Sequence, residues 1–119
     1  MADVAYLIQD LLFSSKVRET AKPMGLTLQG ARDVAGLVAA ARAGARLVIV
    51  DLRLPVALEA LGTLAGDPTL AGIATVGFID HELGDVMEQA RARGCAQVMT
   101  KGQFANGLPK LLAPLAPGA

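Results

Sequence analysis

Five short apolar runs recur along this chain of 119 residues, and between them apolar residues stand three or four positions apart. Runs of this length are typical of buried strands, whereas the wider spacing is that of one face of a helix. Strands that are apolar on both faces are typical of a parallel sheet with helices on each side. The pattern therefore predicts an α/β fold in which five strands alternate with five helices. The runs cover residues 4–8, 26–29, 46–50, 72–78 and 96–100.

Glycine and proline mark the ends of the predicted helices. Gly25, Gly44 and Gly94 stand just past helical stretches whose last turns carry basic residues, which is how helices commonly end. Pro55 fits the first turn of the third helix, where its missing N–H costs little. These positions support the same division of the chain into strands and helices.

The C-terminal stretch has a weaker helical pattern. Asn106 can cap a last helix, and Pro109 then lies in its first turn, which predicts a short helix from Leu108 onward. We expect one domain over residues 1–114, because a chain of this length supports a single hydrophobic core. Residues 115–119 are expected to form a flexible tail.

Composition and charge argue against several classes of protein. The eleven basic and eleven acidic residues cancel, and no basic run is interleaved with aromatic residues, so direct nucleic-acid binding is not expected. Charged residues recur too often for any apolar run of membrane-spanning length, and the start lacks the basic region of a secretory signal, so we expect a cytoplasmic protein without membrane spans. Cys95, the single cysteine, is expected to be a buried hydrophobe, and His81, the single histidine, a surface loop residue.

Polar residues follow the predicted strands at the edge where parallel sheets bind ligands. Asp10 follows the first strand, Asp51 the third and Lys101 the fifth, while Asp80 and His81 come after the fourth. With the strand order 2-1-3-4-5, the first strand lies beside the third, which brings Asp10 and Asp51 into one crevice. The sequence therefore predicts a site made of two carboxylates and one ammonium group at this edge.

Each of these three residues also has an ordinary structural explanation. Asp51 can accept hydrogen bonds from N–H groups of the loop that follows it. Asp10 can cap the first helix. Lys101 can simply neutralise the nearby carboxylates, which would otherwise repel each other. Both kinds of explanation stay open at this point.

Three segments resemble the receiver domains of two-component response regulators, the family of the chemotaxis response regulator. They are "AYLIQD" for the first strand, "LVIVDLRLP" for the phospho-accepting strand and its loop, and "RGCAQVMTK" for the fifth strand and its lysine. The most specific piece is the D-x-x-x-P run from Asp51 to Pro55, and the resemblance covers nearly the whole chain. It implies a flavodoxin-like (βα)5 three-layer sandwich with a parallel sheet of order 2-1-3-4-5.

The resemblance also implies roles for four residues. Asp51 is the implied phosphoacceptor, Lys101 contacts the phosphoryl group, and Mg²⁺ is bound by Asp10, Asp51 and the backbone carbonyl of Arg53. Oxygen ligands suit Mg²⁺, which neutralises the anions that meet in phosphoryl transfer, and a lysine ammonium suits a phosphoryl oxygen. The added charge of about −1.5 to −2 would then bias a bistable loop or helix.

Several positions depart from the family pattern. Gln9 replaces one residue of an acidic pair, and Gly102 replaces the proline that usually follows the lysine. Residues 77–79 offer no hydroxyl at the end of the fourth strand, and Thr75 lies too early to supply it. Val98 stands near the place of an expected aromatic residue. These departures suggest a degenerate receiver, or pseudo-receiver, that serves as a binding surface.

Three classes of function follow. The first is a receiver-like signalling module, possible partners being a histidine kinase or another signalling protein. The second is an enzyme or cofactor carrier on the same fold, which we do not expect, because no phosphate-binding loop, dinucleotide fingerprint or catalytic triad pattern is present. The third is a phosphorylation-independent architectural domain. A homodimer through the fourth helix, fifth strand and fifth helix is compatible with the first and third classes.

Overall fold

The computed structural model describes residues 2–80 and 83–117, and it contains one five-stranded parallel sheet of order β2-β1-β3-β4-β5. The predicted fold class and strand order are confirmed. His81 lies outside the described residues.

The strands are β1 (Val4–Leu7), β2 (Leu28–Gly30), β3 (Leu47–Asp51), β4 (Ala74–Ile79) and β5 (Gln97–Thr100). The helices are α1 (Leu11–Ala21), η1 (Lys22–Met24), α2 (Val34–Arg42), α3 (Ala57–Gly66), α4 (Gly84–Ala92), α5 (Lys101–Leu112) and η2 (Ala113–Leu115), of which η1 and η2 are short 3-10 helices.

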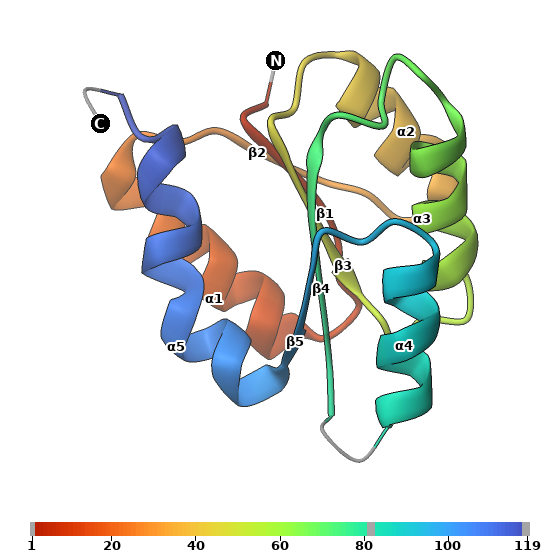
Figure 1. The fold of residues 1–119 in the computed structure, drawn as a ribbon. Helices are drawn as coiled ribbons and strands as arrows, with labels where there is room; N and C mark the ends of the chain where they lie inside the picture. Colours follow the sequence, from red (N-terminus) through yellow and green to blue (C-terminus); the bar gives the residue numbers. More distant parts are fainter. Residues whose placement is uncertain (1, 81–82, 118–119) are drawn as a thin grey trace.

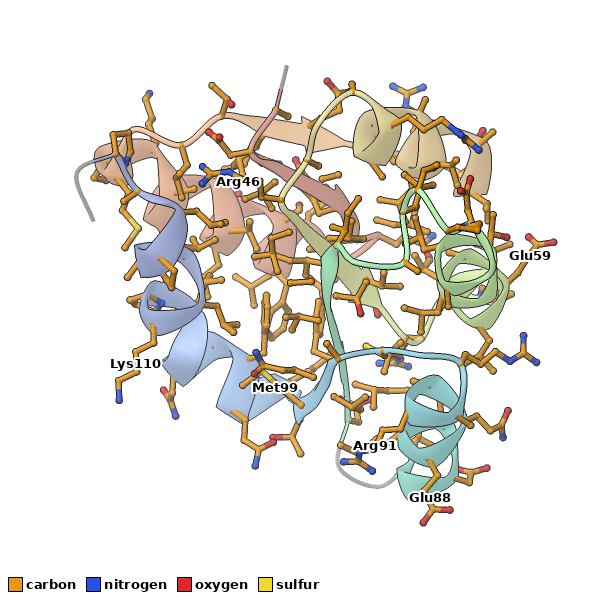
Figure 2. All side chains as sticks on the ribbon, turned by 45° about the horizontal axis from the view of Figure 1, so that its top comes forward. Arg46, Glu59, Glu88, Arg91, Met99 and Lys110 are labelled. Atoms are coloured by element: carbon orange, nitrogen blue, oxygen red, sulfur yellow. The ribbon has the colours of Figure 1, made fainter. Side chains whose placement is uncertain are left out.

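Helices cover both faces of the sheet, so the molecule has three layers (Figure 1). Helices α1 and α5 lie on one face, and α2, α3 and α4 lie on the other. Alternate residues along β3 explain this arrangement, because Ile49 packs toward α1 and α5 whereas Val48 and Val50 pack toward the opposite helices. Charged side chains such as Glu59, Glu88 and Lys110 point away from the body of the protein (Figure 2).

The carboxyl ends of the strands lie at one edge of the sheet. Leu7 at the end of β1 pairs with Val50, Asp51 at the end of β3 pairs with Phe78, and Ile79 at the end of β4 pairs with Thr100. The loops that follow these strands therefore meet at the same edge, at the bottom of Figure 1, where α1 and α5 begin.

Three glycines end helices as the sequence predicts. Gly25, Gly44 and Gly94 have φ angles of 76°, 120° and 94°, a region that residues with side chains rarely adopt. Cys95 follows the last of these and is buried, as expected, and its burial raises the pKa of the thiol.

The third helix begins later than predicted. Pro55 does not lie in its first turn, because α3 starts at Ala57 with Val56 as its N-cap. The residues between the end of β3 and the start of α3 form a turn. In it, the Leu54 N–H donates to the Asp51 carbonyl and the Ala57 N–H donates to the Leu54 carbonyl. Pro55 therefore shapes the loop after β3 and not the helix itself.

The fifth helix begins much earlier than predicted. It starts at Lys101 and not at Leu108, and Pro109 lies inside it. Thr100 and Gln103 form a capping box: the Thr100 hydroxyl accepts from the Gln103 N–H at 3.2 Å, and the Gln103 side chain accepts from the Thr100 N–H at 2.9 Å. One face of the helix is buried, through Phe104, Leu108 and Leu112. The cap and this buried face outweigh the missing N–H of the proline.

The C-terminal end of the described chain packs against the start of β3. One Arg46 guanidinium nitrogen, Nη2, lies 2.8 Å from the carbonyl of Leu115 in η2 and also 2.9 Å from an Asp3 carboxylate oxygen. The division of the chain at residue 114 stays a prediction. Within the described residues, no helix is long and apolar enough to cross a membrane.

Candidate functional site

Asp51 is the last residue of β3, and its side chain is buried, with 4% of the residue surface exposed. It follows Ile49 on the face of the sheet that α1 and α5 cover. One carboxylate oxygen accepts a hydrogen bond from the Arg53 N–H at 3.1 Å. The structural explanation of Asp51, a carboxylate that bonds the loop after its strand, is therefore confirmed.

Asp10 caps α1, which confirms the structural explanation for this residue as well. Its Oδ1 accepts hydrogen bonds from the N–H groups of Leu12, at 2.9 Å, and Phe13, at 3.3 Å. Its second oxygen, Oδ2, lies 3.6 Å from the Lys101 ammonium nitrogen. Asp10 is therefore fixed by the start of the helix and turned toward the lysine.

Lys101 lies between two carboxylates. Its Nζ is 3.6 Å from Asp10 Oδ2 and 3.7 Å from Asp80 Oδ1, and it stands 5.2 Å from the centre of the Phe13 ring. The aromatic face adds a favourable electrostatic contact to the two ion pairs. The expectation that Lys101 neutralises nearby carboxylates is confirmed for Asp10.

Asp80 is the site residue that we did not assign from the sequence. Its Oδ2 lies 3.2 Å from the Arg53 guanidinium, so that Arg53, Asp80, Lys101 and Asp10 form a row of alternating charges, here called the charge row. The available signal was the position of Asp80 directly after the fourth strand, at the edge that carries Asp51. Only the folded chain shows that the Arg53 side chain turns to Asp80.

The predicted site residues surround one open hollow of about 340 Å³. Its lining consists of Gln9, Asp10, Asp51, Arg53 and Lys101. Among the described residues, Lys101 and Arg53 form no ion pair with Asp51, and each pairs instead with a member of the charge row. The structure thus brings together three segments that are distant in sequence around the hollow, with Asp51 at its base.

The oxygen atoms around this hollow fit Mg²⁺. Mg²⁺ is commonly held in proteins by one or two carboxylates, with water or phosphate oxygens completing the shell. Asp10 and Asp51 supply two carboxylates, and the Arg53 carbonyl is a further oxygen on the same loop. Over residues 2–80 and 83–117, no group of three histidine, cysteine or acidic side chains is placed to hold a metal ion. The donor set is therefore a minimal one, and Gln9 adds a neutral amide where an acidic residue would add charge.

No hydroxyl of β4 lies near Asp51. Thr75 pairs with Val48, three residues before Asp51 along β3, which is a separation of about 10 Å along the strand. Its hydroxyl oxygen accepts from the Ala96 N–H at 2.9 Å, so it holds the loop before β5. The expectation that Thr75 lies too early to serve the site is confirmed.

The other β4 positions near Asp51 are filled by packing. Phe78, directly opposite Asp51, is fully buried, and its ring stacks on Phe104 with 4.5 Å between ring centres. At Gly77, a Cβ atom would come within 2.9 Å of the Leu52 side chain, so a serine there would collide unless Leu52 moved. The end of β4 is therefore built for close packing.

Comparison with known proteins finds similar structures but no match to a family model or to a curated protein. The chemotaxis response regulator CheY4 of Vibrio cholerae is similar in structure, with a TM-score of 0.77 and 19% identity over 97% of this chain and 98% of that one. The receiver domain of NtrX from Brucella abortus gives a TM-score of 0.76 and 20% identity, over 98% and 100%.

A third similar structure is the Mn²⁺-bound form of the response regulator Rcp1, with a TM-score of 0.73 and 17% identity over 98% of this chain and 96% of that one. At such identities, likeness over nearly the full length of both chains establishes the fold. The chain therefore has the flavodoxin-like α/β fold of response regulator receiver domains.

Proposed function

We propose that this chain is a receiver-like signal-transduction module of the two-component type that accepts a phosphoryl group on Asp51. The observation that carries the proposal is the position of Asp51 at the base of a polar hollow, with Asp10 and Lys101 beside it. The proposed phosphodonor is a histidine kinase or another signalling protein, and the proposed location is the cytoplasm. In this proposal the module signals through protein contacts and has no substrate of its own to turn over.

The residues of the hollow have complementary tasks in this proposal. A carboxylate oxygen of Asp51 attacks the phosphorus of the donor, the bond from phosphorus to the leaving group breaks, and the leaving group departs with the electron pair. Lys101 pairs with a phosphoryl oxygen. Asp10, Asp51 and the Arg53 carbonyl would hold Mg²⁺, which neutralises the negative charges that meet there. Support for a divalent ion comes from the metal-bound form of Rcp1.

The test is mass spectrometry of the intact protein and its peptides after incubation with acetyl phosphate, from which acetate leaves. Wild type and Asp51→Asn are compared with and without Mg²⁺, at early times because acyl phosphates hydrolyse. We expect a phosphoryl adduct on Asp51 in the wild type alone, and only with Mg²⁺. Absence of an adduct in folded protein, beside a competent receiver as control, would overturn the proposal.

A second candidate is a phosphorylation-independent pseudo-receiver that acts as an architectural interaction domain. It is favoured by Gln9 at the hollow, by the packed end of β4, and by the engagement of Arg53 and Lys101 with Asp80. A homodimer through α4, β5 and α5 is part of this candidate. The test is sedimentation of the unmodified protein. If this candidate is right, we expect a stable dimer and no adduct on Asp51.

A further inference from the structure

Asp80 forms ion pairs with both cations that border the hollow, Arg53 and Lys101. Its two carboxylate oxygens are divided between them, Oδ2 lying 3.2 Å from the Arg53 guanidinium and Oδ1 3.7 Å from the Lys101 ammonium. A phosphoryl group on Asp51 would project into the hollow that the same two cations line. The Asp80 carboxylate and the phosphoryl group would therefore compete for Lys101 and Arg53.

The phosphoryl group is the stronger competitor. It carries a charge of about −1.5 to −2 and three acceptor oxygens, whereas Asp80 carries one negative charge. The pairs of Asp80 are also partly open to water, because 35% of its side chain and 57% of the Arg53 side chain are exposed. Ion pairs of this kind are weak, so they can be exchanged at low cost.

We propose that Asp80 is a positioning residue that holds Lys101 and Arg53 until a phosphoryl group on Asp51 displaces it. This inference rests on the proposed function of Asp51. In receiver domains a hydroxyl at the end of the fourth strand follows the phosphoryl group, and residues 77–79 of this chain carry no hydroxyl. In our proposal the charge row responds to the phosphoryl group instead. The signal is an exchange of counter-ions and not the movement of a hydroxyl.

The displaced residue is connected to the start of α4. Asp80 directly follows β4, and its carbonyl accepts a hydrogen bond at 3.1 Å from the N–H of Leu83, the N-cap residue of α4. Among the described residues, no side-chain hydrogen bond caps the start of this helix. In this proposal, release of the Asp80 side chain loosens this helix start, and α4 carries the change to the surface.

The first test is the rate of Asp51 labelling by acetyl phosphate with Mg²⁺. Asp80→Asn keeps the size of the side chain and removes its charge, so Arg53 and Lys101 lose their ion pairs with Asp80, while Lys101 keeps its pair with Asp10. We expect labelling about three- to tenfold faster than in wild type, the range expected from two part-exposed ion pairs. Asp80→Glu keeps the charge and is expected to stay closer to wild type.

The matched control is Glu88→Gln. Glu88 is an exposed carboxylate on α4 that points away from the body of the protein (Figure 2), so this variant loses the same charge outside the charge row. Its labelling rate is expected to equal that of wild type. A rate increase in Glu88→Gln as large as in Asp80→Asn would mean that net charge alone is responsible, and would overturn the inference.

The second test is hydrogen exchange of the amides of residues 83–92 before and after labelling. In wild type, exchange is expected to rise on labelling, because the phosphoryl group releases Asp80. In Asp80→Asn, exchange is expected to be high beforehand and to change little. A merely structural role of Asp80 would raise exchange in the variant but would not remove the response to labelling.

The outcomes separate this inference from the proposed function. Wild type and Asp80→Asn labelled at equal rates, or a variant labelled more slowly, would overturn the inference and leave the function of Asp51 in place. Labelling of Asp80→Asn alone would overturn both, because Asp80 in the wild type would then hold the cations without ever being displaced. Labelling of neither, in samples shown by circular dichroism to be folded, would overturn both.

Discussion

Asp10 uses its two carboxylate oxygens for different purposes. Oδ1 caps α1 through the N–H groups of Leu12 and Phe13, whereas Oδ2 faces Lys101 at the hollow. A single substitution to alanine would remove both functions at once. A pair of substitutions can separate them, because asparagine keeps an oxygen that caps a helix but carries no charge.

We expect Asp10→Ala to lower the free energy of unfolding by about 0.5–2 kcal/mol, the usual effect of losing an N-cap. Asp10→Asn is expected to stay closer to wild type in urea unfolding, while Mg²⁺-dependent labelling of Asp51 falls in both variants. Asp33→Ala is the matched control, since Asp33 caps α2 through the Gly36 N–H at 2.7 Å without reaching the hollow. It should lose stability and keep labelling; equal stability of the two Asp10 variants would contradict the capping role.

At the scale of elements, α5 shows how a local cap and a buried face together decide where a helix begins. The capping box of Thr100 and Gln103 places the first helical residue at Lys101, and so fixes the backbone from which this lysine reaches the charge row. Phe104 then lies in the first turns of the helix, where its ring packs on Phe78 of β4. The helix start thus connects the site to the core.

Substitution of Thr100 tests this helix start. Thr100→Ala is expected to lower the free energy of unfolding by about 0.5–2 kcal/mol, because the Gln103 N–H loses its acceptor. Thr100→Ser keeps the hydroxyl and is expected to unfold close to wild type. The urea midpoints of the three proteins are the measurement, and similar midpoints for the alanine and serine variants would show that the cap contributes nothing.

At the scale of the whole molecule, Asp3 joins elements at the sheet edge opposite the hollow. Its carboxylate accepts from the Thr27 N–H before β2 at 2.9 Å and from Arg46 before β3, while Arg46 also reaches η2. The hydrogen bond from the Thr27 backbone, followed by Arg46 and the Thr27 hydroxyl, holds the pKa of Asp3 below its usual value. Asp3 therefore stabilises the fold more strongly when it is ionised.

This pKa gives a prediction for the pH dependence of stability. A carboxyl group whose pKa is lowered by folding stabilises the protein above its unfolded pKa of about 3.9, and this contribution is lost as the pH falls through the folded value. We expect Asp3→Asn to be less stable than wild type at pH 7 and the difference to shrink as the pH falls below about 4. Urea unfolding over this range is the measurement, with Glu88→Gln as the charge control; a difference that grows in acid would contradict it.

Several features of the fold and site could be predicted from local sequence alone. The five apolar runs predicted the strands to within a residue or two, and Gly25, Gly44 and Gly94 predicted helix ends, because hydrophobic periodicity and positive φ angles are local requirements. The convergence of Asp10, Asp51 and Lys101 could also be predicted, since strand order alone places the carboxyl ends of parallel strands together. The start of α5 differs from the predicted one, because the Thr100 and Gln103 cap and the buried face of the helix together outweigh the effect of Pro109.

The sequence by itself determined the alternation of strands and helices, because this follows from the spacing of apolar residues along the chain. It also determined which charged residues are available at one edge of the sheet, because these are the residues that directly follow the strands. Only the tertiary structure decided which charges meet. Asp10, Arg53 and Asp80 come from three different loops and Lys101 from the start of α5, and their pairing depends on the side-chain directions that packing imposes on these segments. An ion pair forms over a few ångströms and weakens with distance and with exposure to water, so no spacing along the chain can specify it.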